Sequence, residues 1–415
     1  MQGFCYQAYA RLRFLAMKDL ESRMIKTIVI KGFKSIPELT LELGRVNCFI
    51  GANGVGKSNI LEAIGVLGAA ANGVVDSESL LRRGVRPGLP RLYKTSFTGG
   101  RTPPEIRLSA IGAQGEEYRT SILNPIDKPE PAWEFKTEYL RDSNTEILTA
   151  GVRSLKNLKP TAGLAALKLV DLSPDNPAAK LMQQLQDYAI YSPNTPTLRA
   201  MVADPQTRSP LGLSGGRLAD AFAELKSALD ADPQLMDSVL ELIDWVVDID
   251  AVSTASSLLS PSVSRTGQNV LKLTDRYMKS GRNSLTAYDA SEGALYVLFS
   301  AILCLSPAAP MVLAIDNLDQ ALNPRLAMRL TEKLSYWLKK NDARRQLLFT
   351  THNPAVLDGL DLSDDEIRLF AVDRNSEGHT SVIRIEPTEK LLKMNKEYPL
   401  SRLWMMGHLG ALPNV

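Results

Sequence analysis

Residues 51–58 read GANGVGKS, and this stretch decides the fold. It fits the pattern G-x-x-x-x-G-K-[ST], a loop whose successive backbone N–H groups curl around phosphate oxygens. The apolar run Val46–Ile50 before it predicts a strand, and apolar residues at helical spacing over 57–71 predict a helix after it. The helix N-terminus adds partial positive charge beside a bound phosphate. A glycine turn that only caps a helix is the alternative, but four matched positions in this context favour a phosphate loop.

The phosphate loop predicts a bound nucleoside triphosphate with Mg²⁺. Lys57 is expected to reach the β- and γ-phosphates, and the Ser58 hydroxyl to bind Mg²⁺. Such a site also needs an acid at the end of a neighbouring strand, and Asp316 follows the apolar run MVLAI. An aspartate that only caps a turn is the alternative for Asp316. The predicted ATP-binding residues are Gly51, Asn53, Gly54, Gly56, Lys57, Ser58 and Asn59, with Ser58 and Asp316 as metal ligands.

The composition excludes several other classes of protein. The 415 residues include 48 basic and 46 acidic side chains, so a net charge of +2 gives no global electrostatic case for nucleic-acid binding. The three cysteines are widely spaced, which fits a reducing compartment and no disulfide framework. No run of apolar residues is long enough to span a membrane. A cytoplasmic protein is therefore expected.

Four further motifs accompany the phosphate loop in a fixed order along the chain. They are GFKS at 32–35, DASEGALYVLFSAI at 289–302, IDNLDQALNP at 315–324 and LLFTTHNP at 347–354. Together with GANGVGKSN, they make the sequence resemble the ATP-binding-cassette (ABC) head of the RecF, SMC and OLD-type ATPases. The resemblance covers about residues 24–125 and 265–400.

This resemblance implies roles for three more residues. Ser291 and Gly293 match the signature turn, which caps the γ-phosphate of ATP on the opposite subunit. Two heads would then face each other with two ATP molecules between them. His352 would be the switch histidine that senses the γ-phosphate, although a histidine that caps the following turn is the alternative. GLSGGR at 212–217 looks more like the signature of transporters, but its position favours Ser214 as a helix N-cap.

The order of predicted elements gives an α/β fold. Strands alternating with helices in the last third of the chain predict a largely parallel sheet covered by helices. We therefore expect an ABC-ATPase head with a mostly parallel core sheet, an antiparallel β subdomain and a helical insertion. The expected segments are an N-terminal extension (1–23), an N-terminal lobe (24–125), the helical insertion (126–265), a C-terminal lobe (266–400) and a C-terminal tail (401–415).

Asn317 stands where the resemblance implies a glutamate that activates water. An amide cannot accept a proton, and losing a general base typically costs about 10²- to 10⁴-fold in rate. Three interpretations stay open. The Asn317 amide orients water and hydrolysis is slow; or Asp319, which would share a face with Asn317 if the strand continued, supplies the acid; or ATP is chiefly structural. Leu318 and Asn323 also depart from the family pattern, which bears on hydrolysis more than on binding.

The sequence also leads to an expectation about the biological role of the ATPase. About 60 residues follow His352, too few for the Toprim nuclease of OLD-type relatives, and no long coiled coil is predicted. The chain looks like the ATPase subunits of bacterial antiphage systems such as the Septu type, in which a separate effector nuclease is the partner. A RecF-like DNA-repair ATPase and an ATP-locked scaffold are the alternatives. Four arginines are candidates for DNA contact, namely Arg82, Arg83, Arg86 and Arg91.

Overall fold

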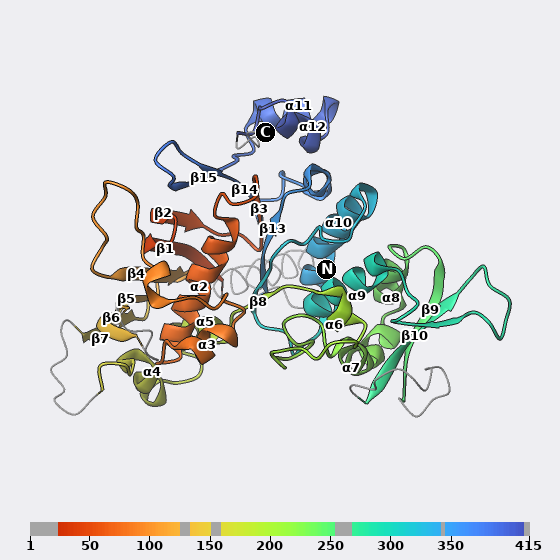
Figure 1. The fold of residues 1–415 in the computed structure, drawn as a ribbon, viewed down its shortest axis with the longest axis horizontal. Coiled ribbons are helices and arrows are strands. Elements are labelled where there is room, and N and C mark those ends of the chain that lie inside the picture. The colour runs from red at the N-terminus through yellow and green to blue at the C-terminus, as the bar shows by residue number, and fades with distance from the viewer. Residues whose placement is uncertain (1–23, 125–132, 151–158, 254–267, 342–344, 411–415) are drawn as a thin grey trace, which may run out of the picture.

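The computed structural model describes residues 24–124, 133–150, 159–253, 268–341 and 345–410 (Figure 1). The expected N-terminal extension, 1–23, lies outside the described residues, as does the end of the C-terminal tail. Within these ranges the chain forms two six-stranded sheets and one three-stranded sheet. No helix in the described ranges is long and apolar enough to cross a membrane.

The core sheet has the strand order β15-β14-β3-β13-β12-β8, and all neighbours are parallel except β14 and β15. A parallel sheet is covered on both faces, and the central strands of this sheet are buried along their whole length. The mostly parallel α/β fold predicted above is therefore confirmed. Its strands are β3 (Val46–Ile50), β8 (Ala189–Tyr191), β12 (Val312–Ile315), β13 (Gln346–Thr351), β14 (Ile367–Arg374) and β15 (Thr380–Arg384).

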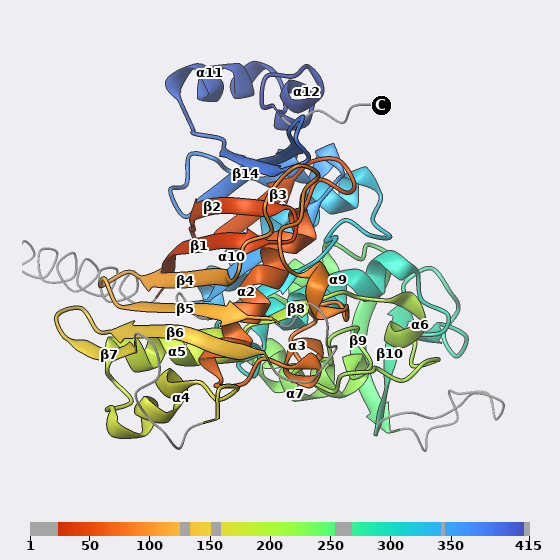
Figure 2. The same cartoon turned by 60° about the vertical axis from the view of Figure 1, so that its left-hand side comes forward.

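The antiparallel sheet has the order β2-β1-β4-β5-β6-β7, which can be followed from top to bottom in Figure 2. The three-stranded sheet, β11-β10-β9, lies on the opposite side of the core sheet (Figure 1). The strands of the antiparallel sheet are β1 (Ile25–Phe33), β2 (Ile36–Glu42), β4 (Ile106–Gly112), β5 (Glu117–Leu123), β6 (Glu134–Arg141) and β7 (Glu146–Ala150). Those of the three-stranded sheet are β9 (Val246–Ser253), β10 (Asn269–Asp275) and β11 (Ser284–Thr286).

The helices lie on both faces of the core sheet. In the first half of the chain they are α2 (Lys57–Ala71), α3 (Ser77–Leu81), α4 (Leu164–Lys168), α5 (Pro177–Asp187) and α6 (Thr195–Leu198). In the second half they are α7 (Leu218–Ala231), α8 (Pro233–Leu240), α9 (Glu292–Leu305), α10 (Pro324–Asn341), α11 (Glu389–Glu397) and α12 (Leu400–Met405). The short 3₁₀ helices are η1 (Pro90–Leu92), η2 (Leu169–Asp171) and η3 (Pro354–Gly359).

The segment 126–265 is not purely helical, so that expectation needs correction. It contributes β6 and β7 to the antiparallel sheet, β8 to the core sheet and β9 to the three-stranded sheet. The run PQLMDSVLELIDWVVDI at 233–249 looks like one helix, but α8 ends at Leu240 and β9 begins at Val246. Pairing of β9 with β10 outweighs the local helical pattern.

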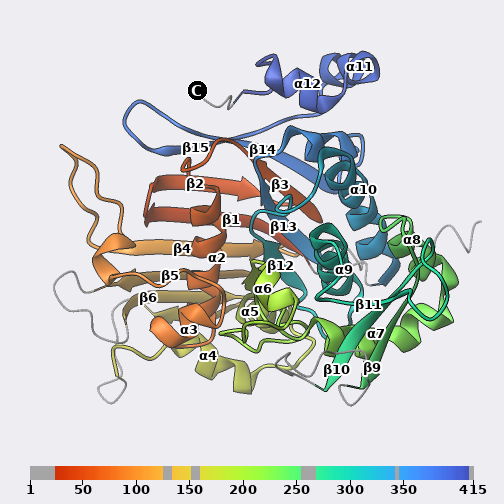
Figure 3. The same ribbon diagram turned by 45° about the vertical axis from the view of Figure 1, so that its right-hand side comes forward.

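Two hydrophobic clusters meet at the core sheet, one on each face. Cys48, Leu313 and Phe349 belong to the cluster shared with α7, α9 and α10. Phe49 and Leu348 belong to the cluster shared with α2, α5 and the antiparallel sheet. This alternation is the period of two that a strand imposes on its side chains. Figure 3 shows α2 crossing in front of the antiparallel sheet, so the helix that follows the phosphate loop is enclosed on almost every side.

Candidate functional site

The phosphate loop joins β3 to α2, as its sequence predicts. Gly56 is the N-cap of α2 and has a φ of 111°, in the left-handed region that favours glycine. A Cβ atom at this position would lie 2.1 Å from Thr380 Oγ1, so there is also no room for a side chain. Gly56 therefore allows the chain to turn tightly into the helix.

The Lys57 ammonium lies against the loop. Its Nζ donates hydrogen bonds of 2.8 Å to the carbonyl oxygens of Gly51 and Ala52. Burial lowers the pKa of Lys57, and the nearby carboxylates of Asp316 and Asp319 oppose this shift. A desolvated cation interacts strongly with an anion, because the local dielectric is low. The ammonium is thus placed to exchange its carbonyl partners for phosphate oxygens.

Asp316 lies beside the first turn of α2. The parallel register pairs Ile315 with Phe349, which brings the next residues, Asp316 and Thr350, together. Asp316 Oδ1 accepts hydrogen bonds from Ser58 Oγ at 3.1 Å and from Thr350 Oγ1 at 2.6 Å. A hydroxyl and a carboxylate oxygen are hard donors that suit Mg²⁺, which commonly takes few protein ligands beside phosphates and water. The predicted metal ligands therefore lie together and fit the ion.

Asn317 has a φ of 57°, one of few non-glycine residues in the described ranges with a positive value. Its backbone N–H donates to Thr350 Oγ1 at 2.8 Å. Asparagine tolerates the left-handed conformation better than most residues. Because β12 ends at Ile315 and the chain turns there, the expectation that Asp319 shares a strand face with Asn317 is wrong.

Asp319 nevertheless reaches the site through this turn. Its side chain is only 3% exposed, and its Oδ2 lies 3.4 Å from His352 Nδ1. The other carboxylate oxygen, Oδ1, is buried and has no hydrogen-bond partner among the described residues. The His352 side chain is half exposed. A buried carboxylate thus lies beside one nitrogen of a half-exposed imidazole.

A polar network that the sequence analysis missed supports the opposite side of the loop. Glu62 of α2 is buried and pairs with both Lys34 and Arg86. Burial opposes the charge of Glu62, but its two cationic partners outweigh that effect and hold its pKa below the usual value. Asn59 Nδ2 donates to Ser35 Oγ at 2.7 Å. A lone acid inside the apolar run ILEAIGVLG was the available sequence signal for this network.

A cavity of about 550 Å³ lies against this network and the turn after β1. Its lining includes Lys34, Ser35, Arg86 and Tyr93. Burial is the main reason that the pKa of Tyr93 rises to about 12, so its hydroxyl remains a hydrogen-bond donor at neutral pH. Ser35 of its lining accepts the hydrogen bond from Asn59, so the cavity lies beside the first turn of the helix that follows the phosphate loop.

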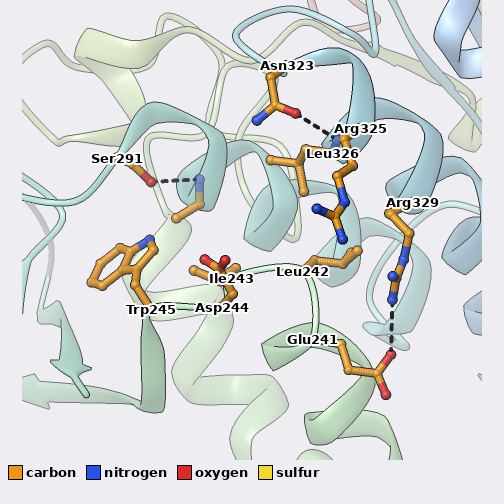
Figure 4. A pocket seen from close by; sticks show the side chains of 11 residues that line it. Glu241, Leu242, Ile243, Asp244, Trp245, Ser291, Asn323, Arg325, Leu326 and Arg329 are labelled. Carbon is orange, nitrogen blue, oxygen red and sulfur yellow. Dashed lines mark hydrogen bonds and ion pairs between the residues drawn. The ribbon is translucent and has the colours of Figure 1, made fainter. Parts of the chain in front are cut away.

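The signature residues lie at a different place. Ser291 is the N-cap of α9, and its Oγ accepts a hydrogen bond of 3.4 Å from the Ala294 backbone. A Cβ atom at Gly293 would lie 3.1 Å from Leu326 Cδ2, so α9 begins tightly against the start of α10. Ser291 lines a second cavity, of about 440 Å³, to which no described phosphate-loop residue contributes (Figure 4).

Two other sequence expectations need correction. Arg83 is buried and donates to the carbonyl oxygens of Ser79 and Gln186, so it cannot contact DNA. Ser214 is not a helix N-cap, because α7 begins at Leu218. The chain turns first at Gly215, which has a φ of 97°, and a Cβ atom there would lie 2.3 Å from Leu198 Cδ2.

Two family models match the chain. The model described as "AAA domain, putative AbiEii toxin, Type IV TA system" matches residues 218–358, and one described as "AAA ATPase domain" matches residues 24–80. The second range contains the phosphate loop, and the first contains Ser291, Asp316 and His352. The matched segments therefore carry the motifs whose geometry is described above.

The chain is also similar to solved SMC heads. The crystal structure of an SMC head bound to the C-winged helix domain of ScpA is 13% identical with a TM-score of 0.53, covering 89% of this chain and 99% of that one. The SMC head domain from Thermotoga maritima is 14% identical with a TM-score of 0.46, covering 88% and 99%. Only the first supports a shared fold. The chain is therefore similar to AAA ATPase domains over residues 24–80 and 218–358, and it shares the fold of an SMC head, with Asp316 beside the first turn of the helix that follows the phosphate loop.

Proposed function

We propose that this protein binds ATP with Mg²⁺, hydrolyses it slowly, and uses the ATP-bound state to hold two heads together and regulate a separate effector. One observation carries the proposal. The Ser58–Asp316 pair is built to bind the nucleotide's metal ion, whereas the adjacent position holds an amide, Asn317, in place of an acid. The site therefore has the groups needed to bind ATP with Mg²⁺, but Asn317 cannot take a proton from the attacking water.

Slow hydrolysis follows from the positions of the remaining side chains. Bound Mg²⁺ would neutralise charge on the β- and γ-phosphates, and Lys57 would add to this effect. Asn317 can orient water through its amide but cannot take its proton. The Asp319–His352 pair is the only nearby acid–imidazole pair among the described residues of this site, and we assign the residual turnover to it. Asp319 holds His352 by Nδ1, and the imidazole faces the water.

We infer dimerisation because the two elements proposed to contact ATP, the phosphate loop and the turn at Ser291, lie apart within one copy. Ser291 is exposed at the N-terminus of α9 and lines a cavity apart from its own phosphate loop. Two copies facing each other would bring the Ser291 of one copy to the phosphate loop of the other. Two ATP molecules would then lie between the copies, and slow hydrolysis would give the dimer a long life.

The effector is proposed to be a nuclease of an antiphage system, held or released by the ATP-bound dimer. The end of the chain offers a place for it. Leu403 and Trp404 of α12 pack into the core, whereas Met405 and Met406 are 60% and 54% exposed. The similar SMC head, bound to a winged-helix domain, is a precedent for a head of this fold that binds a second protein. The matching model described for a toxin–antitoxin system also fits a protein that controls an effector.

The test combines phosphate release with mass measurement of the purified protein in Mg·ATP. The Lys57→Ala variant supplies the baseline for both. We expect wild-type release only slightly above this baseline and an ATP-dependent doubling of mass that the variant lacks. Rapid release would contradict the proposal. Salt-sensitive, ATP-dependent binding to duplex DNA by the protein alone would favour a RecF-like function instead, and assemblies larger than a dimer without turnover would favour a scaffold.

A further inference from the structure

The cavity beside Ser291 is lined by an arginine for which the described residues supply no ion-pair partner. Arg325 and Arg329, one turn apart on α10, both line this cavity. Arg329 turns towards Glu241, at 3.8 Å, and Glu241 also accepts from Lys333 at 2.5 Å. Figure 4 shows the Arg325 guanidinium pointing into the cavity instead. Arg329 therefore belongs to an ion-pair cluster, whereas Arg325 does not.

The charge of Arg325 is unbalanced in this position. Its side chain is exposed, and within the described ranges no carboxylate lies within ion-pair distance of it. It is the second residue of the 18-residue helix α10, whose N-terminus carries partial positive charge. A cation is therefore unfavourable at this point unless an anion approaches it.

The polar groups around Arg325 also suit an anion. The N-terminus of α9, capped by Ser291, and the N-terminus of α10, capped by Asn323, open into the same cavity. Trp245 supplies an apolar wall. Two carboxylates, those of Glu241 and Asp244, line the cavity as well. Glu241 is paired with Arg329 and Lys333, so Asp244 is the one that would oppose a bound anion. Two helix N-termini and the unpaired Arg325 guanidinium therefore outweigh the one carboxylate that is not balanced by a cation.

The position of the cavity indicates where the anion comes from. It contains no described residue of the chain's own phosphate loop, so the ATP of the same copy is excluded. Gly293 packs against Leu326, which keeps Ser291 and Arg325 on one rigid surface. A triphosphate presented by a second copy would meet both side chains together.

We propose that Arg325 contacts, in trans, the triphosphate of ATP bound to a second copy of the chain. The inference rests on the proposed head dimer and adds to it a cation that stabilises the shared ATP. Charge-assisted hydrogen bonds of this kind change an equilibrium by roughly ten- to a hundredfold. Arg325→Ala should therefore raise the protein concentration for half-dimerisation in Mg·ATP at least tenfold. Arg329→Ala, the matched control on the same helix, should change it little, and Asp244→Asn should lower it.

Mixtures of variants distinguish contact in trans from contact within one copy. Lys57→Ala, which lacks its own ATP, is mixed with either wild type or Arg325→Ala, and the mass of each mixture is measured in Mg·ATP. If Arg325 acts in trans, each mixed dimer holds one complete site, formed by the arginine of the Lys57→Ala copy. The mixed dimer, distinguished from homodimers by a mass tag on the Lys57→Ala copy, should then form equally well in both mixtures, and more readily than the Arg325→Ala homodimer at the same concentration.

Two results would overturn the inference. The first is a mixed dimer of Lys57→Ala with Arg325→Ala that forms at least tenfold more weakly than the mixed dimer of Lys57→Ala with wild type, because the arginine would then act within its own copy. The second is an Arg325→Ala protein that dimerises like wild type. A wild-type protein that never dimerises with ATP would instead refute the proposed function, and the inference with it. Circular dichroism of each variant confirms that it is folded.

Discussion

Replacing Asn317 by glutamate should accelerate ATP hydrolysis. The substitution adds a proton acceptor directly after Asp316. Asp316 is fixed in the site by hydrogen bonds from the Ser58 and Thr350 hydroxyls. A general base is typically worth about 10²- to 10⁴-fold in rate. This range corresponds to about 2.7–5.5 kcal/mol of activation free energy.

The backbone at this position limits the gain. Asn317 has a φ of 57°, and glutamate is less suited than asparagine to the left-handed region, at a cost of about 1 kcal/mol. Even if all of this strain disturbed the catalytic geometry, the rate would fall only about fivefold. We therefore expect Asn317→Glu to release phosphate at least about tenfold faster than wild type, with a free energy of unfolding lower by about 1 kcal/mol.

The assay is steady-state phosphate release in Mg·ATP, and Asn317→Gln is the matched control. Glutamine has the size of glutamate and meets the same backbone strain, but it cannot accept a proton. The gain should therefore be absent in Asn317→Gln. If the glutamate and glutamine variants release phosphate at the same rate, the missing base does not limit hydrolysis and the reasoning is wrong.

Three further substitutions test the rest of the site. Asp319→Asn, which keeps the shape but removes the charge that holds His352, should lower residual phosphate release at least tenfold while ATP-dependent dimerisation persists; unchanged release would exclude the pair from catalysis. Glu62→Gln should lower the free energy of unfolding by about 1–3 kcal/mol at neutral pH, because it leaves the Lys34 ammonium, 18% exposed, without its carboxylate, whereas Arg86, 63% exposed, stays solvated. Since the pKa of Glu62 is lowered in the folded protein, wild type keeps this stabilisation above pH 4.5 and loses it as pH falls through the folded pKa, so denaturant titrations should show the difference shrinking in acid. Thr350→Val should lower Mg²⁺ affinity in the presence of ATP about 10- to 100-fold, as seen by titration, because Asp316 loses the hydroxyl that orients it; an unchanged affinity would mean that Asp316 needs no such support.

The parts of the fold that follow from local pattern could be predicted. Phe49 and Leu348 alternate with Cys48 and Phe349 between two cores, and such continuous apolar runs are typical of buried parallel strands. The proximity of Ser58 and Asp316 also follows, because the carboxyl ends of parallel strands share one edge of the sheet.

The features that depend on tertiary contacts could not be predicted. β8 has three residues, Ala189–Tyr191, and directly follows the helical run of α5, so only its pairing with β12 makes it a strand. The burial of Arg83 depends on carbonyl oxygens, including that of Gln186, about a hundred residues along the chain. Asp319 reaches His352 because the chain turns after Ile315, where β12 ends. The alternation of residues along a strand cannot predict such a turn.

The lifetime of the ATP-bound dimer tests the central claim most directly. The protein is loaded with Mg·ATP, excess nucleotide is removed, and the mass is followed over time beside Asn317→Glu. We expect the wild-type dimer to outlast the Asn317→Glu dimer by at least about tenfold, because hydrolysis of ATP is the step that ends it. A wild-type dimer that separates as fast as the variant, or a protein that stays monomeric with ATP bound, would contradict the claim that slowly hydrolysed ATP holds two heads together.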